Sequence, residues 1–190
     1  MIEFLSIPKT IVLVGMLGAG KTSIGRRLAK HLGLAFADSD QEVELAANCS
    51  IEDIYDLYGE AAFQEVEMRV IKRLLENPVH VLSTGGGAFI HEPTRHLIQA
   101  KGISIWIRAA METILPRVER RDHRPQLKSA DKRQKLEDLI EQYYPIYAQA
   151  DIIVDSDNST PDAMTARIVQ EINRYISLQQ KDANQRIQHA

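Results

Sequence analysis

The feature that most constrains this chain is the glycine-rich segment GMLGAGKT at residues 15–22. It fits the pattern G-x-x-x-x-G-K-[ST], in which glycines let the backbone turn its N–H groups inward around an anion. A short β-branched run, TIVLV, precedes it, and an amphipathic stretch with Ile24, Leu28 and Leu32 follows. This order predicts a buried strand, a phosphate-binding loop and a helix whose positive N-terminus points at the same anion.

Short apolar runs alternate with longer amphipathic runs along the rest of the chain. Further strands are expected at residues 34–40, 79–87, 102–109 and 151–156, with helical patterns between them and after the last one. The strand at 34–40 ends in acids, and the one at 79–87 runs into a glycine turn. Five strands separated by helices predict an α/β fold, a three-layer sandwich with a five-stranded parallel sheet between helices.

We expect one domain over residues 1–178, followed by a polar tail at 179–190 that frays. Two irregular inserts, at 41–60 and 121–132, are placed to cap a site. Within the helical patterns, Pro116 is expected near a first turn and Pro145 at a break or an end.

Composition excludes several classes of partner. The net charge is −3 and 26% of the residues are charged, which argues against wholesale binding of nucleic acid or a membrane surface. Cys49 is the single cysteine, so no internal disulfide can form. No apolar run approaches the roughly 20 residues of a membrane helix, and the N-terminus lacks the features of a signal peptide. These observations predict a cytoplasmic protein.

Two acids follow the second strand. Asp38 and Asp40 are expected at its carboxyl end, the edge where open α/β sheets bind ligands, with both carboxylates pointing the same way. One can position Mg²⁺, together with the Thr22 hydroxyl, and the other can hold or deprotonate an attacking hydroxyl group. In the alternative interpretation the acids form a helix N-cap and a solvated turn.

Two further segments suit a phosphoryl-transfer site. The triplet at residues 85–87 permits close approach of a ligand to backbone N–H groups, although a flexible loop is the alternative. A basic segment after the fourth strand includes Arg117 and Arg124 and has no apolar period. We expect it to be a mobile lid at about 118–131 that closes on ATP and excludes water.

Together these segments resemble the shikimate kinase family, which are P-loop kinases of the nucleoside-monophosphate-kinase type. The likeness runs from about Pro8 to Ser177, and its motifs occur in the family's order and spacing: GMLGAGKT, DSD, YGEAAF, STGGGA and RRDHRPQL. The resemblance implies a single kinase domain that transfers the γ-phosphate of ATP to the 3-hydroxyl of shikimate, in aromatic amino-acid biosynthesis. It also implies Mg²⁺, an acceptor-binding region at about 41–70 and a monomer without nucleic-acid or membrane partners.

The resemblance assigns roles residue by residue. The nucleotide-binding residues would be Gly18, Ala19, Gly20, Lys21, Thr22, Ser23, Arg117 and Arg124. The metal would be held by Thr22 and Asp38. The acceptor-binding residues would be Asp40, Gln64, Gly85, Gly86, Gly87 and Tyr143. The catalytic groups would be Lys21, Asp40 and Arg124.

Two positions depart from the family's pattern. Gln64 and Tyr143 stand where the family has arginines that clasp the carboxylate of shikimate. A neutral amide or phenol does not replace a bidentate arginine. Arg69 or Arg73, on the same predicted helix as Gln64, is a possible substitute.

Three interpretations therefore stay open: a shikimate kinase with a rearranged carboxylate site, a kinase of the same fold acting on a polyol or cyclitol without a carboxylate, and a non-catalytic ATP-binding module. The retained reactive groups argue against the last. A GTPase is disfavoured because no N-K-x-D-like motif is present.

Overall fold

The computed structural model describes residues 6–119, 132–157 and 159–188, with side chains as far as residue 185. Its centre is a five-stranded sheet in the order β2-β3-β1-β4-β5, and every neighbouring pair of strands is parallel. The strands are β1 Thr10–Val14, β2 Ala35–Asp38, β3 His80–Ser83, β4 Gly102–Ala109 and β5 Ile152–Ser156. The predicted α/β class and parallel sheet are confirmed.

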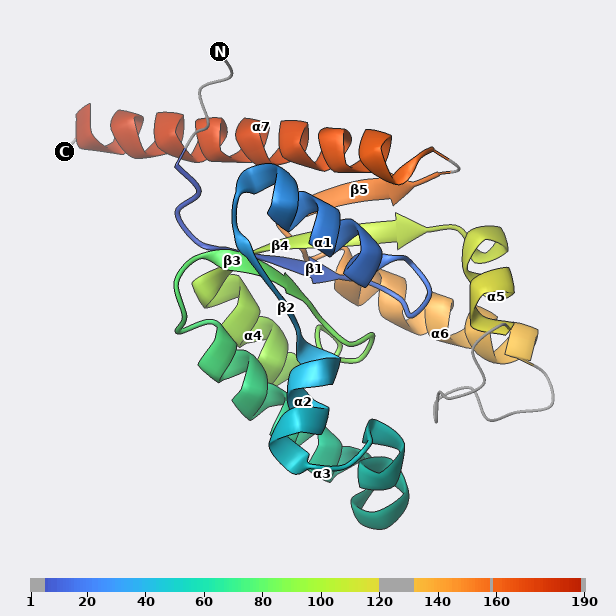
Figure 1. Cartoon of the computed structure of the whole chain (residues 1–190). Coiled ribbons are helices and arrows are strands. Elements are labelled where there is room, and N and C mark those ends of the chain that lie inside the picture. The colour runs from blue at the N-terminus through green and yellow to red at the C-terminus, as the bar shows by residue number, and fades with distance from the viewer. Residues whose placement is uncertain (1–5, 120–131, 158, 189–190) are drawn as a thin grey trace.

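Helices cover both faces of this sheet and complete the three layers (Figure 1). One face carries α1 and α7, and the other carries α3, α4 and α6 (Figure 1). The helices are α1 Lys21–Leu32, α2 Ser39–Ala47, α3 Ile51–Leu74, α4 Glu92–Lys101, α5 Met111–Glu119, α6 Lys132–Tyr147 and α7 Pro161–Gln188. None of the helices in the described part of the chain is long and apolar enough to cross a membrane.

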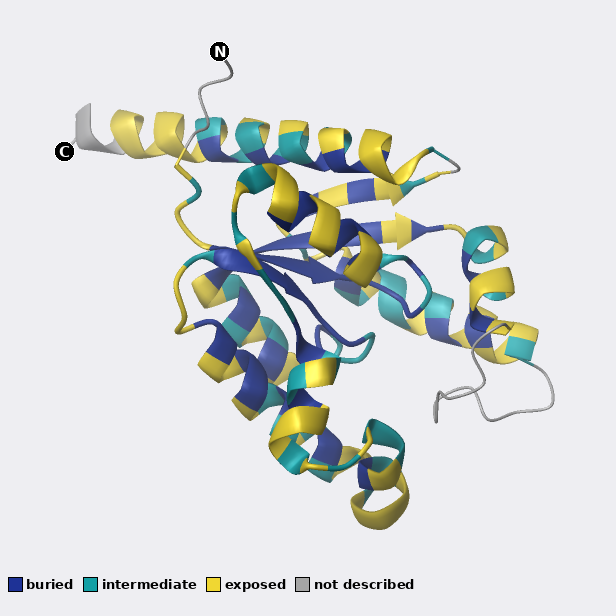
Figure 2. Ribbon diagram, viewed as in Figure 1, coloured by how far each residue is buried: buried dark blue, intermediate teal, exposed yellow. Residues whose placement is uncertain are grey.

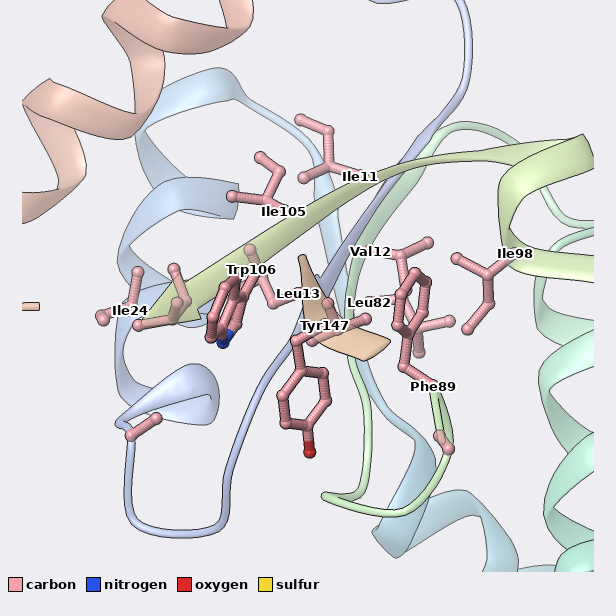
Figure 3. Packing of buried hydrophobic residues seen from close by; sticks show 14 of the residues in the cluster. Ile11, Val12, Leu13, Ile24, Leu82, Phe89, Ile98, Ile105, Trp106 and Tyr147 are labelled. Atoms are coloured by element: carbon pink, nitrogen blue, oxygen red, sulfur yellow. The ribbon is translucent and has the colours of Figure 1, made fainter. Parts of the chain in front are cut away.

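The inner strands are buried on both faces, as a parallel sheet requires. All five residues of β1 are buried, whereas the edge strands β2 and β5 are partly exposed (Figure 2). Successive side chains of a strand point to opposite faces, so each layer of helices meets its own set of apolar residues. Figure 3 shows this packing around β1 and β4.

An aromatic cluster fills the layer under α6. Tyr147, fully buried, lies with its ring centroid 5.7 Å from that of Trp106 and 6.4 Å from that of Phe89 (Figure 3). Tyr144 meets Trp106 edge to face at 5.0 Å. Such ring pairs stabilise beyond their buried area, so the end of α6 is fixed firmly to β4.

The expected insert at 41–60 is helical, as the helical patterns in its sequence predict, and it is not irregular. Ser50 and Asp53 form a capping box that starts α3, and Gly59, at φ 80° and ψ 175°, interrupts the helix without ending it. The other insert, at 121–132, lies outside the described residues except for its last residue, which begins α6.

Helix ends also differ from expectation. Pro116 lies within α5, five residues after its start, and α6 continues through Pro145 to Tyr147. Each proline removes one backbone hydrogen bond, and tertiary packing offsets that cost. The polar tail at 179–190 does not fray from its beginning, because α7 continues to Gln188. Residues 179–185 are exposed but are mostly good helix formers without proline or glycine.

Candidate active site

The glycine-rich loop joins β1 to α1, as predicted. Its conformation depends on positive φ angles at Gly15 (135°), Gly18 (78°) and Gly20 (96°), which side chains rarely adopt. A Cβ at Gly15 would also lie only 2.8 Å from the Ile107 carbonyl oxygen. The loop therefore fits tightly over the end of β4, with the N-terminus of α1 facing into it.

Two cations lie on this loop. Lys21 is 7% exposed, and its Nζ donates hydrogen bonds to the carbonyl oxygens of Gly15 at 2.6 Å and Met16 at 2.9 Å. Arg117, on α5, donates from Nη1 to the Gly18 carbonyl at 3.2 Å. The loop thus carries positive charge on its inner side and at its rim, as binding of a polyphosphate requires.

The two acids behave differently from one another. β2 ends at Asp38, so the expectation that Asp40 extends the strand is wrong, because Asp40 lies in the first turn of α2. Asp38 Oδ1 accepts a hydrogen bond from the Asp40 N–H at 3.1 Å, which makes Asp38 the N-cap of α2. Its other oxygen, Oδ2, accepts from the Thr22 hydroxyl at 2.8 Å. Asp38 therefore caps α2 with one oxygen, as the capping interpretation predicts, and contacts the start of α1 with the other.

Thr22 and Asp38 provide oxygen donors suited to Mg²⁺. The Ser83 hydroxyl, which sequence reasoning missed, lies 3.3 Å from the Thr22 hydroxyl. The described residues contain no cluster of three or more acidic, histidine or cysteine side chains that could enclose a metal. A carboxylate and hydroxyl groups beside a phosphate-binding loop match an ion that takes its remaining ligands from phosphates and water.

A cavity of about 330 Å³ runs along the carboxyl edge of the sheet. Its lining includes every loop residue assigned to the nucleotide and both residues assigned to the metal. It also includes four other residues that the sequence analysis singled out: Asp40, Gly85, Gly86 and Arg117. Gln64, Gly87 and Tyr143 are not among its lining residues.

The cavity has a wall that sequence reasoning missed. It comes from the end of β5, the connection that follows it and the start of α7: Ser156, Asp157, Ser159, Pro161 and Met164. The position of β5 in the sheet is the signal that could have found it, because parallel strands end at the same edge. This wall and the glycine-rich loop line the same cavity.

Hydrogen bonds from several parts of the chain hold the glycine triplet after β3. The Gly85 N–H donates to the Ser39 hydroxyl at 3.1 Å, and the Tyr147 hydroxyl donates to the Gly86 carbonyl at 2.5 Å. The Gly87 carbonyl accepts from the Ile90 and His91 N–H groups, which turns the chain toward α4. Gly85 and Gly86 thus border the cavity on a fixed turn, and Gly87 belongs to the turn itself.

Gln64 and Tyr143 come together around Glu60. The Gln64 amide donates to Glu60 Oε1 at 3.1 Å. Burial, and then the Glu60 charge, raise the pKa of Tyr143. Neither Arg69 nor Arg73 stands in for a missing arginine, because both are exposed, Arg69 pairs with Glu65 and Arg73 with Glu42.

Glu67 is a buried acid that sequence reasoning also missed. It is 1% exposed, and both of its carboxyl oxygens lie without a hydrogen-bond partner among the described residues. Burial first, and then the Asp40 charge, raise its pKa to about 8, against the opposing effect of Lys21. The sequence holds a signal for it, because Glu67 falls on the apolar stripe of α3 between Phe63 and Val70.

One assigned residue cannot be placed. Arg124 lies outside the described residues, as does the expected lid apart from its first two residues, which end α5.

The geometry at the loop is that of a phosphate-binding loop, and comparison with known proteins gives the family. The family model described as shikimate kinase matches residues 17–173. A shikimate kinase of Paramagnetospirillum magneticum is 53% identical over 173 residues, covering 91% of this chain and 89% of the relative. The chain belongs to the shikimate kinase family.

Other members agree over most of their length. A shikimate kinase of Caulobacter vibrioides is 50% identical over 161 residues, covering 85% of this chain and 80% of the relative. The solved shikimate kinase from Acinetobacter baumannii in complex with shikimate is 35% identical and superposes with a TM-score of 0.85, covering 87% of this chain and 93% of that one. The family resemblance, the fold and the assignment to phosphotransferases that act on an alcohol group are confirmed.

Proposed function

We propose that this chain transfers the γ-phosphate of ATP to the 3-hydroxyl of shikimate. The observation that carries the proposal is a single cavity with the P-loop at one end and Asp40, Gly85 and Gly86 at the other, in a chain of the shikimate kinase family. A relative of the same fold was solved with shikimate. In-line transfer needs donor and acceptor side by side, and this cavity offers both places.

The phosphate end stabilises the transferring group. The backbone N–H groups of Gly18, Gly20 and Lys21, together with the start of α1, would bind the phosphates, and the Ala19 N–H closes the loop onto the Met16 carbonyl. Lys21 exchanges its two carbonyl partners for phosphate oxygens when ATP binds. Arg117 at the rim adds charge beside the nucleotide, and Arg124 is proposed, from the family resemblance, to do so at the γ-phosphate.

Thr22 and Asp38 would hold Mg²⁺, with Ser83 beside them. The ion neutralises charge on the β- and γ-phosphates when it is bound. Thr22 and Asp38 already share a hydrogen bond, so their oxygens are held close together before the ion arrives.

Asp40 is proposed to hold the acceptor hydroxyl and to take its proton. Its position in the first turn of α2 lets the Asp38 side chain fix its backbone N–H. Gly85 and Gly86 border the space next to it and let the acceptor ring approach the backbone. Because the proton must leave the hydroxyl as the phosphoryl group arrives, a carboxylate within hydrogen-bond reach is the required group.

One observation favours a second candidate acceptor, a cyclitol or other polyol without a carboxylate. Gln64 and Tyr143 are neutral and gather around Glu60, an acid. Such a surface offers hydrogen bonds but no positive charge to an anion. A non-catalytic role is less well supported, because Lys21, Thr22 and Asp38 are all present and line the same cavity, as phosphoryl transfer would require.

The enzyme is proposed, from the family resemblance, to act as a monomer. We place it in the cytoplasm, a reducing compartment in which the single cysteine needs no partner. Nucleic acid and membrane are not proposed partners.

The test is identification of the product. The purified chain with ATP, Mg²⁺ and shikimate should form one shikimate 3-phosphate per ADP, measured by phosphorus NMR and mass spectrometry. Asp40→Asn should remove transfer, while Asp56→Asn, an exposed acid of α3, should not. A phosphorylated cyclitol without phosphorylated shikimate would establish the second candidate. ADP formation without any phosphorylated acceptor would refute both.

A further inference from the structure

Glu67 stands apart from the other acids of the site. Asp38 accepts two hydrogen bonds, whereas both oxygens of Glu67 are buried and unpartnered among the described residues. An ionised carboxylate that is buried in this way loses its hydrogen bonds to water, and no protein donor replaces them. A group so placed keeps its proton instead of its charge.

Glu67 lies next to the acceptor end of the cavity. A Cβ placed on Gly85 would meet Glu67 Oε1 at 2.7 Å and Asp40 Oδ1 at 2.6 Å, so the two carboxyl groups approach the same point above Gly85. Two carboxyl groups that share a site do not both ionise readily. Asp40 lines the cavity and Glu67 lies behind it, so the buried member of the pair is the one to stay neutral.

The charged and titratable groups around Glu67 act in both directions. Asp40 on α2 disfavours its ionisation, and Lys21 on α1 favours it. Tyr147 on α6 also interacts with it, but its own pKa is raised well above the ordinary value, mainly by burial, so it stays neutral. Together with burial, which is the largest influence, these groups raise the pKa of Glu67 to about 8. When ATP occupies Lys21, its phosphates add negative charge and favour the neutral acid further.

We propose that Glu67 is a positioning residue for an anionic acceptor: it stays uncharged in the working enzyme, and its ionisation places a second negative charge beside Asp40 and expels the acceptor. This inference rests on the proposed function, in which the acceptor carries a carboxylate. A neutral Glu67 would help the pocket to bind an anion although Gln64 and Tyr143 carry no positive charge. With Glu67 protonated, one negative charge fewer repels the carboxylate of the acceptor.

The experiment is a pH profile of acceptor KM and of kcat at saturating Mg²⁺ and ATP, with shikimate as the probe. For the wild type, KM should be flat below the Glu67 midpoint and rise about tenfold for each pH unit above it, because binding then requires a proton on the carboxyl group. The kcat should change much less. Glu67→Gln, which mimics the neutral acid, should keep the low-pH KM across the whole range.

Glu65→Gln is the matched control. Glu65 lies two residues away on α3, is exposed and pairs with Arg69, so this variant should follow the wild-type profile. A merely structural role for Glu67 would alter stability without removing the pH dependence of KM. A flat wild-type KM, or a Glu67→Gln profile that rises like the wild type, would overturn the proposal.

A second measurement separates this inference from the proposed function. Infrared difference spectra of wild type against Glu67→Gln at pH 6 should contain the carbonyl stretch of a protonated carboxylic acid. If the band is present and shikimate binds more weakly at high pH, without being turned over, the proposed function fails and the inference stands. If shikimate is turned over but the band is absent, the inference fails and the proposed function stands. If neither the band nor the pH-dependent binding appears, the inference is wrong whatever the acceptor.

Discussion

The two ends of the cavity are built in opposite ways. At the phosphate end, polar side chains have hydrogen-bond partners within the chain: Lys21 donates to two loop carbonyls, and Thr22 donates to Asp38. At the acceptor end, Glu67 has no partner among the described residues, and Gln64 bonds to Glu60 instead of facing the cavity. The pairing of polar groups within the described part of the chain therefore distinguishes the two ends.

The difference teaches where specificity is set. The phosphate end should tolerate few substitutions, because its side chains are held in place by hydrogen bonds to one another and to the loop. An end with an unpartnered buried acid can respond to pH and to substitution in either direction. Substitutions at the two ends should therefore differ in kind as well as in size.

The largest expected effect is at the phosphate end. Lys21→Met keeps most of the buried stem but removes the charge, so phosphoryl transfer should fall by about 10²–10³ or more. Steady-state assays with ATP and shikimate measure it, and thermal unfolding should show a folded protein. Lys30→Met, an exposed lysine in the last turn of α1, is the control. Turnover within a few-fold of wild type in folded Lys21→Met would contradict the assignment.

The second effect tests the acceptor end by restoring charge. The double substitution Gln64→Arg with Tyr143→Arg should lower the KM for shikimate about 10- to 100-fold relative to a neutral cyclitol. The gain corresponds to one or two charge-assisted hydrogen bonds, less the attraction of the new cations to Glu60.

Gln134→Arg, on the exposed first turn of α6, adds a positive charge away from the cavity and should leave the preference unchanged. If the double variant shows no gain while the wild type already binds shikimate tightly, another residue holds the carboxylate.

The third effect concerns stability and pH. Because the pKa of Glu67 is about 8 in the folded chain and 4.5 in the reference state, the folded protein binds an extra proton between these values. The contribution of Glu67 to stability is therefore greatest at low pH and is lost as the pH rises toward 8.

Glu67→Gln should gain on the wild type in free energy of unfolding over this window, by at most about 1.4 kcal/mol for each pH unit. Denaturant unfolding at a series of pH values measures the gap. A gap that stays constant with pH would mean that Glu67 ionises normally.

The smallest expected effect comes from the hydrogen bond between Tyr147 and the glycine turn. Tyr147→Phe removes the hydroxyl that donates to the Gly86 carbonyl and should cost about 0.5–1.5 kcal/mol of stability. The acceptor KM should rise, by less than about tenfold, while the KM for ATP stays close to wild type. Tyr144→Phe is the matched control, because its hydroxyl donates to Ala109 at the end of β4. Equal effects of the two variants on acceptor KM would show that Tyr147 does not position the glycine turn.

The sequence predicted the phosphate end better than the acceptor end, for physical reasons. A P-loop is local: its glycines, its lysine and the start of the helix that follows are close neighbours in the sequence, so the pattern alone specifies the geometry. The acceptor end depends on contacts between segments far apart, such as Tyr147 with Gly86 and Glu67 with Gly85. Asp40 shows why local pattern is insufficient at the acceptor end. The sequence left open whether Asp38 is a helix N-cap, and that cap places Asp40 in a helix instead of at the end of a strand.

The position of Trp106 has an optical consequence. It is the single tryptophan of the chain, and its ring lies against the P-loop, where a Cβ at Gly15 would come within 3.1 Å of Trp106 Cδ1. Two tyrosines flank the same ring, one of them the residue that holds the glycine turn. The emission of this one indole therefore arises at the point where both ends of the cavity meet. Unmodified protein should thus carry its own fluorescent reporter, with nucleotide binding and acceptor binding changing the same signal.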